Sequence, residues 1–104
     1  MKQKAPRLTM STMKVLKAFM DNPRDQLSGI DITNGVGIKS GTLYPILIRL
    51  EDAGWLSSHW EENTPEEMGR PRRRFYRITG KGQNATQSAF SELDMGLEGV
   101  AWSL

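Results

Sequence analysis

One amphipathic segment constrains the fold of this chain more than any other. Residues 41–53 carry apolar side chains at the spacing of a helix that buries one face, namely Leu43, Ile46, Leu47 and Leu50. Ser40 precedes the segment as a capping residue, and Gly54 is suited to ending it. Pro45 lies one turn inside, where its steric clash would fall on the carbonyl of the flexible Gly41. The sequence therefore predicts a well-formed helix here.

Two shorter helices are predicted before this one. Residues 11–22 show helical apolar spacing and can be capped by Thr9 or Ser11. A second helix is expected to start at a Ser28 cap and to end before Gly35, where a glycine-bearing turn leads into the third helix. Two helices joined by such a turn form a helix–turn–helix unit.

The periodicity changes after the third helix. Residues 55–60 alternate in polarity, residues 63–69 are polar with turn-forming residues, and residues 73–78 form an aromatic-rich returning segment. This pattern predicts a β-hairpin with a long charged tip. Three helices followed by a hairpin indicate an α+β fold, a winged helix–turn–helix domain over residues 1–79.

The C-terminal part is predicted to be helical from Thr79 onward. Its apolar side chains are spaced three and four residues apart, as in a coiled-coil seam: Phe90, Leu93, Leu97, Val100 and Leu104. We interpret residues 80–104 as a C-terminal dimerisation helix and tail. The alternative is a helix that packs back on its own core.

Charge is distributed unevenly along the hairpin. The formal net charge is only +2, but five arginines fall within eight positions, directly after four glutamates: Arg70, Arg72, Arg73, Arg74 and Arg77, after Glu61, Glu62, Glu66 and Glu67. A local basic cluster is typical of phosphate binding, and a solvated hairpin balanced by its own glutamates is the alternative. At least one of the last two arginines is expected to be structural and to pair with these glutamates.

Several function classes are disfavoured by composition. The chain has no cysteine and one histidine, His59, so disulfides, metal sites and histidine-based catalysis are not expected. No carboxylate pair or nucleophile–base set stands out, and we expect neither an enzyme nor a cofactor. No apolar run reaches the ~20 residues that span a bilayer, and the start lacks a signal-peptide pattern. A cytoplasmic protein without a membrane partner is expected.

Two motifs carry a family resemblance. The start of the third helix, Ser40-Gly41-Thr42-Leu43-Tyr44-Pro45, resembles the recognition helix of PadR-type transcriptional regulators. Residues 69–79, followed by Gly82, are similar to the wing of that family, in its small subfamily. The resemblance implies a dimeric repressor that binds a palindromic operator and dimerises through its C-terminal helix. It also implies release by a small aromatic or cationic effector, although Leu93 replaces the tryptophan of multidrug-binding members.

A winged helix of this kind places the third helix in the major groove of double-stranded DNA and its wing on the backbone or minor groove. Two such helices in a dimer call for half-sites about one helical turn, ~34 Å, apart. Ten residues are expected to contact DNA: Lys39, Ser40, Gly41, Thr42, Tyr44, Ile48, Arg49, Arg70, Arg72 and Arg73.

Three of these residues can be interpreted further, and two of them have alternatives. Tyr44 can bind a phosphate or base, or be a half-buried packing residue. Ile48 can meet a thymine methyl group. Arg49 can pair with guanine or form a salt bridge with Glu61 or Glu62. For the whole chain, the alternative function is a winged-helix protein–protein interaction module without specific DNA binding.

Overall fold

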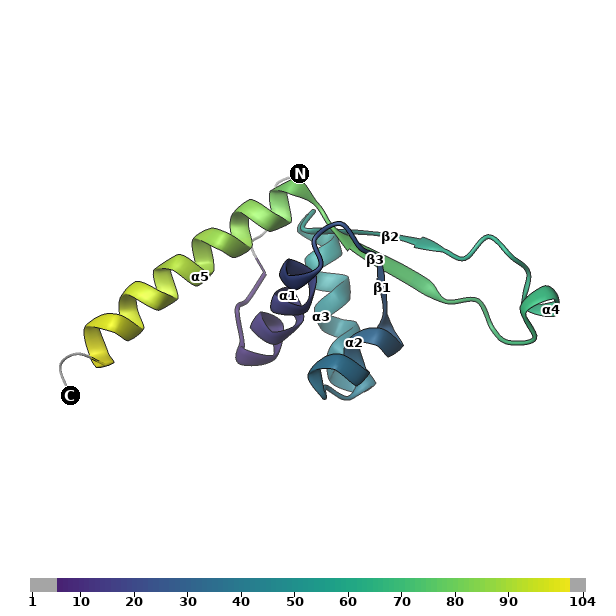
Figure 1. Cartoon of the computed structure of the whole chain (residues 1–104), viewed down its shortest axis with the longest axis horizontal. Coiled ribbons are helices and arrows are strands. Elements are labelled where there is room, and N and C mark those ends of the chain that lie inside the picture. The colour runs from purple at the N-terminus through teal and green to yellow at the C-terminus, as the bar shows by residue number, and fades with distance from the viewer. Residues whose placement is uncertain (1–5, 102–104) are drawn as a thin grey trace.

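The computed structural model describes the backbone of residues 6–101 and the side chains of residues 6–93. Its elements are α1 (Met10–Asp21), β1 (Leu27–Ser28), α2 (Gly29–Val36), α3 (Ser40–Asp52), β2 (Leu56–Trp60), α4 (Pro65–Met68), β3 (Arg74–Ile78) and α5 (Gly80–Ala101). Figure 1 shows α1, α2 and α3 gathered beneath a small sheet, with the β2–β3 hairpin projecting to one side and α5 to the other. The α+β winged-helix prediction is confirmed.

Each of the first two helices begins directly after a residue whose side chain caps it. The backbone N–H of Thr12 donates to the Thr9 hydroxyl over 3.1 Å and so caps α1. At α2, Ser28 and Asp31 form a reciprocal capping box, with hydrogen bonds of 2.9 and 3.2 Å. The predicted end of α2 before Gly35 is wrong by two residues. Gly37 is the residue that adopts the left-handed conformation, at φ 73°, and the helix continues to Val36.

The start of α3 also differs from the prediction. Lys39, with an extended backbone, is the N-cap and makes no side-chain capping bond, while Ser40 is the first helical residue. Ile38 is buried just before it and anchors the turn in the core. Pro45 lies inside the helix. Gly54 lies just beyond the end of the helix and has a φ of 80°. The helix itself matches the prediction to within one residue at each end.

The sheet has three antiparallel strands in the order β1-β3-β2. Leu56 pairs with Ile78 at one end of the hairpin and Trp60 with Arg74 at the other. β1 was missed because two residues are too few to show a period. α4 was also missed: the predicted polar loop contains one helical turn, which Thr64 caps and Gly69 ends in the left-handed conformation.

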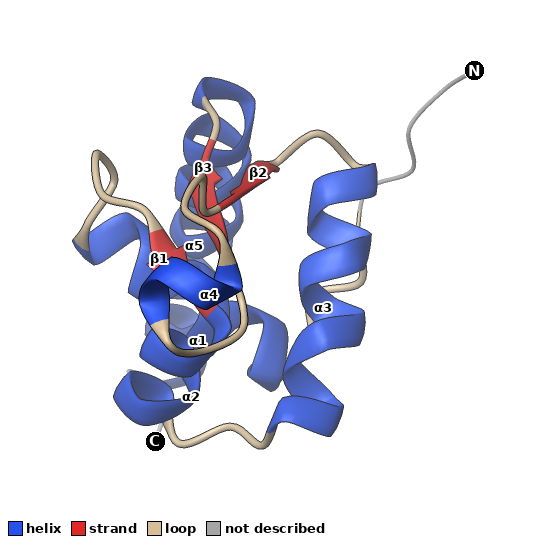
Figure 2. Cartoon of the chain, turned by 90° about the vertical axis from the view of Figure 1, so that its right-hand side faces the viewer, coloured by secondary structure: helices blue, strands red, loops and turns tan. Residues whose placement is uncertain are grey.

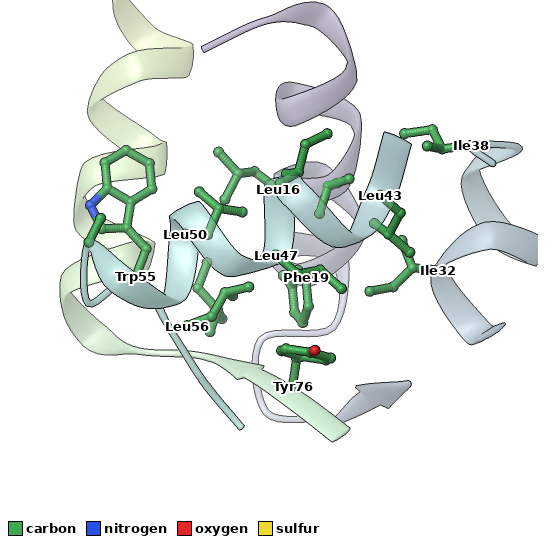
Figure 3. Packing of buried hydrophobic residues seen from close by; sticks show 14 residues of the cluster. Leu16, Phe19, Ile32, Ile38, Leu43, Leu47, Leu50, Trp55, Leu56 and Tyr76 are labelled. Carbon is green, nitrogen blue, oxygen red and sulfur yellow. The ribbon is translucent and has the colours of Figure 1, made fainter. Parts of the chain in front are cut away.

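The core lies between the three-helix unit and the inner face of the sheet (Figure 3). Phe19 of α1, Leu47 of α3 and Tyr76 of β3 meet there, and all three are 5% exposed or less. Tyr76 is buried on the face that β3 turns towards α3, so the same face continues outward along the hairpin.

Helix α5 leaves the body after its first turns, as Figure 1 shows. Phe90 is half-buried against the core, whereas Leu93 is 40% exposed. The side chains of Leu97, Val100 and Leu104 lie outside the described residues. Within residues 6–101, no helix is both long and apolar enough to cross a membrane.

Candidate nucleic-acid interface

Three segments that are distant in the sequence line one groove of about 380 Å³. We call it the recognition groove, and its residues come from the start of α2, the first turns of α3 and the base of the hairpin tip: Ser28, Gly29, Ile30, Tyr44, Arg70, Pro71, Arg72 and Arg73. Figure 2, viewed from the end of the hairpin, shows α4 in front and α3 to one side. The groove brings four of the predicted contact residues together. The start of α2 was missed, because only the fold brings it beside the hairpin.

Tyr44 is held against α2 while part of its ring stays exposed. A Cβ atom at position 29 would overlap the hydroxyl end of the tyrosine, so the ring lies directly on Gly29. The Tyr44 residue is nevertheless 42% exposed. The packing and binding interpretations are therefore compatible: α2 positions the ring, and the groove leaves it accessible.

The rest of the α3 surface is polar at its start and apolar one turn later. Lys39, Ser40, Gly41 and Thr42 are all exposed at the N-terminal end of the helix. Ile48, one turn after Tyr44 on the same face, is 58% exposed. A large apolar side chain is thus presented to solvent beside groups that can donate hydrogen bonds.

The hairpin tip is tied together by Glu61. Its carboxylate accepts two hydrogen bonds from the Arg70 guanidinium, at 2.7 and 2.9 Å, and a third from the backbone N–H of Arg73 at 2.7 Å. Arg72 donates its Nε–H to the carbonyl of Asn63 over 3.0 Å. Arg70 is therefore neutralised in place. Neither Arg72 nor Arg73 has a carboxylate within salt-bridge distance in the part of the chain that the structure describes.

The hydrogen bonds from Arg70 lower the pKa of Glu61 to about 2, against an ordinary value of 4.5. Because the folded-state pKa is the lower one, ionised Glu61 stabilises the folded tip fully above about pH 4.5, and this contribution is lost as the pH falls towards 2. We expect an NMR titration of the Glu61 carboxyl carbon to give a midpoint of about 2, rising towards 4.5 in Arg70→Ala. A midpoint already near 4.5 in the unsubstituted protein would show that the ion pair between Glu61 and Arg70 does not form.

A second polar cluster joins α3 to the hairpin. Arg74 donates to the hydroxyl of Ser58 at 2.9 Å, and that hydroxyl donates to the carboxylate of Glu51 at 2.5 Å. Arg74 also lies 3.5 Å from Glu51. Arg74 or Arg77 was expected to pair with one of the hairpin glutamates; Arg74 is ion-paired, but its partner is Glu51 of α3, so the predicted partner is wrong. Among the described residues, Arg49 forms a salt bridge with neither Glu61 nor Glu62, and it is exposed.

The described residues thus include an exposed helix start, the exposed apolar side chain of Ile48, and two wing-tip arginines, Arg72 and Arg73, without a carboxylate partner. Among the residues that the structure describes, no group of three histidine, aspartate or glutamate side chains is placed to hold a metal ion.

The chain is similar to known transcriptional regulators. Residues 28–88, more than half of the chain, match the sequence model of the transcriptional regulator PadR-like family. None of the curated proteins compared matches the chain significantly.

Solved structures with this fold include several regulators. A PadR family transcriptional regulator from Eggerthella lenta is 25% identical with a TM-score of 0.74, over 88% of this chain and 79% of that one. A PadR-like transcription factor from Bacteroides fragilis is 25% identical with a TM-score of 0.68, over 88% and 89%. A PadR family regulator from Clostridium difficile shares the fold at 17% identity, with a TM-score of 0.74 over 90% and 97%.

Proposed function

The chain belongs to the PadR-like family of transcriptional regulators, and from this premise we propose that it is a dimeric repressor that binds a specific double-stranded DNA operator. The family consists of regulators, so the prediction that the chain is not an enzyme is confirmed. The observation that carries the proposal is the recognition groove, where Tyr44 on α3 faces the arginines of the hairpin, here called the wing (residues 56–78). The start of α3 and the basic wing border one groove. This arrangement fits double-stranded DNA, with α3 in the major groove and the wing beside it.

The ten predicted contact residues divide by chemistry. Exposed hydroxyls and backbone N–H groups at residues 39–42 suit a phosphate. Tyr44, Ile48 and Arg49 would meet base edges or thymine methyl groups. Arg72 and Arg73 would contact the backbone or minor groove, and Arg70 would act mainly by shaping the tip through Glu61.

Dimerisation through residues 80–104 completes the proposal, with residues 1–79 as the DNA-binding unit. Phe90, Leu93, Leu97, Val100 and Leu104 form the proposed seam. The exposure of Leu93 on a helix that leaves the body supports a partner there. Two copies related by a two-fold axis would read a palindrome, and a small aromatic effector bound between them would release the DNA. The protein would act in the cytoplasm.

Selection from a random duplex pool, followed by fluorescence anisotropy with the selected duplex, tests this function. We expect an inverted repeat with half-sites about one helical turn, ~34 Å, apart. Its affinity should exceed that of a scrambled duplex by about 10³-fold or more at physiological salt. A selection without any enriched sequence, and equally weak binding to all duplexes, would contradict the proposal and favour a protein partner for the wing.

Gly29→Ala is expected to weaken DNA binding about tenfold without unfolding the protein, because the new Cβ displaces the ring of Tyr44. The displaced atoms are the far end of a side chain, so the cost in stability should be about 1 kcal/mol. Combined with Tyr44→Ala, Gly29→Ala should cause no further reduction in affinity, since both act on one contact. Gly35→Ala is the control on the same helix, with open space at its Cβ. Additive effects in the double variant would show that Gly29 does not act through Tyr44.

A further inference from the structure

We propose that the inner face of the wing, centred on Trp60, holds the sugar–phosphate backbone of one DNA strand, with the indole against a deoxyribose and Arg72 on the adjoining phosphate. The inference rests on the proposed function and adds a contact that the sequence did not single out. The inner face is the one that turns Ser58 and Arg74 towards Glu51 of α3. Trp60 pairs with Arg74 in the hairpin, so its side chain lies on this same face.

Trp60 is exposed but held in place. It is 54% exposed, an unusual position for the largest apolar side chain. The guanidinium of Arg74 lies 5.3 Å from the ring centroid, within the range of a cation–π contact. Arg74 is fixed in turn by Ser58 and Glu51. One face of the indole is therefore stacked on a clamped cation, and the ring forms a rigid exposed surface.

A groove of about 860 Å³, here called the tryptophan groove, lies beside this ring. Trp60, two prolines and the wing tip line it: Trp60, Thr64, Pro65, Glu66, Pro71 and Arg72. Pro71 and Arg72 also line the recognition groove, so the two grooves are neighbours that share these two residues. A strand that follows the wing arginines away from α3 would lie in the tryptophan groove.

The chemistry of the tryptophan groove suits a sugar and its phosphate better than a base edge. Its walls are mainly apolar, and they offer few donors or acceptors with which to read a base. The remaining N–H groups of Arg72 can bind a phosphate, because only its Nε–H is occupied, by the Asn63 carbonyl. Glu66 also lines the groove, and because its carboxylate repels a phosphate, it favours a phosphate position next to Arg72.

Fluorine NMR of fluorotryptophan-labelled protein tests the contact directly. The chain has three tryptophans, and the signal of Trp60 is assigned as the one missing in Trp60→Phe. We expect the selected duplex to shift this signal, while that of the buried Trp55 stays in place. Trp60→Ala should raise the Kd about tenfold and leave the slope of log K against log salt unchanged, as expected when an apolar contact is removed. Trp60→Phe, which keeps a ring, should recover most of the affinity.

His59→Ala is the matched control, since His59 is the exposed neighbour of Trp60 on the other face of β2. It should leave the Kd unchanged. Tight duplex binding with an unmoved Trp60 signal and an unaltered Kd in Trp60→Ala would overturn this inference and leave the proposed function standing. A Trp60 signal that changes only with protein concentration would assign the groove to a second copy of the chain and also overturn it. If no duplex binds the unsubstituted protein, that result contradicts both the proposed function and this inference.

Discussion

Replacing Gly82 with alanine is expected to destabilise the fold by about 1–3 kcal/mol, the usual cost of an atom forced into a packed interior. A Cβ atom at this position would overlap the backbone carbonyl oxygen of Trp55 and come within 2.9 Å of Ile78. That carbonyl accepts the N–H of Thr79 at 2.9 Å, and the N–H of Gly82 donates to the Thr79 hydroxyl at 3.0 Å. Both sides of the clash are hydrogen-bonded backbone, so neither can swing aside.

The sign of the change in unfolding free energy distinguishes a steric clash at Gly82 from an effect of helix propensity. Gly82 lies in α5, and in a free helix alanine is favoured over glycine by up to about 1 kcal/mol. Gly80→Ala, two residues earlier with open space at its Cβ, should therefore be neutral or slightly stabilising. Urea unfolding followed by circular dichroism gives both free energies. A Gly82→Ala protein as stable as the Gly80→Ala protein would refute the close contact between α5 and Trp55.

Removing the two unpaired wing arginines is expected to have the largest effect on DNA binding. Arg72→Ala/Arg73→Ala should raise the Kd for the selected duplex about a hundredfold or more, because each arginine can form a charge-assisted hydrogen bond with DNA. The plot of log K against log salt should also flatten by about one unit for every phosphate that the variant no longer binds. Anisotropy titrations over a range of salt concentrations measure both quantities.

Arg77→Ala provides the charge-matched control for this experiment. Arg77 is exposed on β3 and pairs with Ser57, on the face of the hairpin that points away from α3. Its removal changes the net charge by the same amount per residue but should alter the Kd less than twofold at physiological salt. Equal reductions in affinity from Arg77→Ala and from the single Arg72→Ala variant would mean that only net charge matters, and would contradict a specific role for the wing tip.

The helices and the hairpin could be predicted from the sequence because their signals are local. The stripe from Leu43 to Leu50 defines α3, and the Ser28 cap defines the start of α2. The position of the α3 cap was missed because Lys39 takes the extended cap conformation without any side-chain bond, so the polar Ser40 was the better candidate by type alone.

The sequence indicated the residue types of the proposed site but not their arrangement. The sequence placed Arg70 among the DNA contacts, and only the folded tip shows that Glu61, nine residues earlier, neutralises it. Gly29 and Trp60 carried no local signal at all. Their importance comes from what the fold brings beside them: Tyr44 over the glycine and Arg74 over the indole.

The most direct test of the central claim is to map the DNA contact on the protein itself by amide NMR, with the selected duplex titrated into isotope-labelled protein. We expect the largest shifts at residues 28–30, 39–44, 60, 70, 72 and 73, which line the two grooves and the start of α3. Shifts concentrated instead on the exposed side of α5, at residues 84–92, would contradict it and place the nucleic-acid surface elsewhere on the molecule.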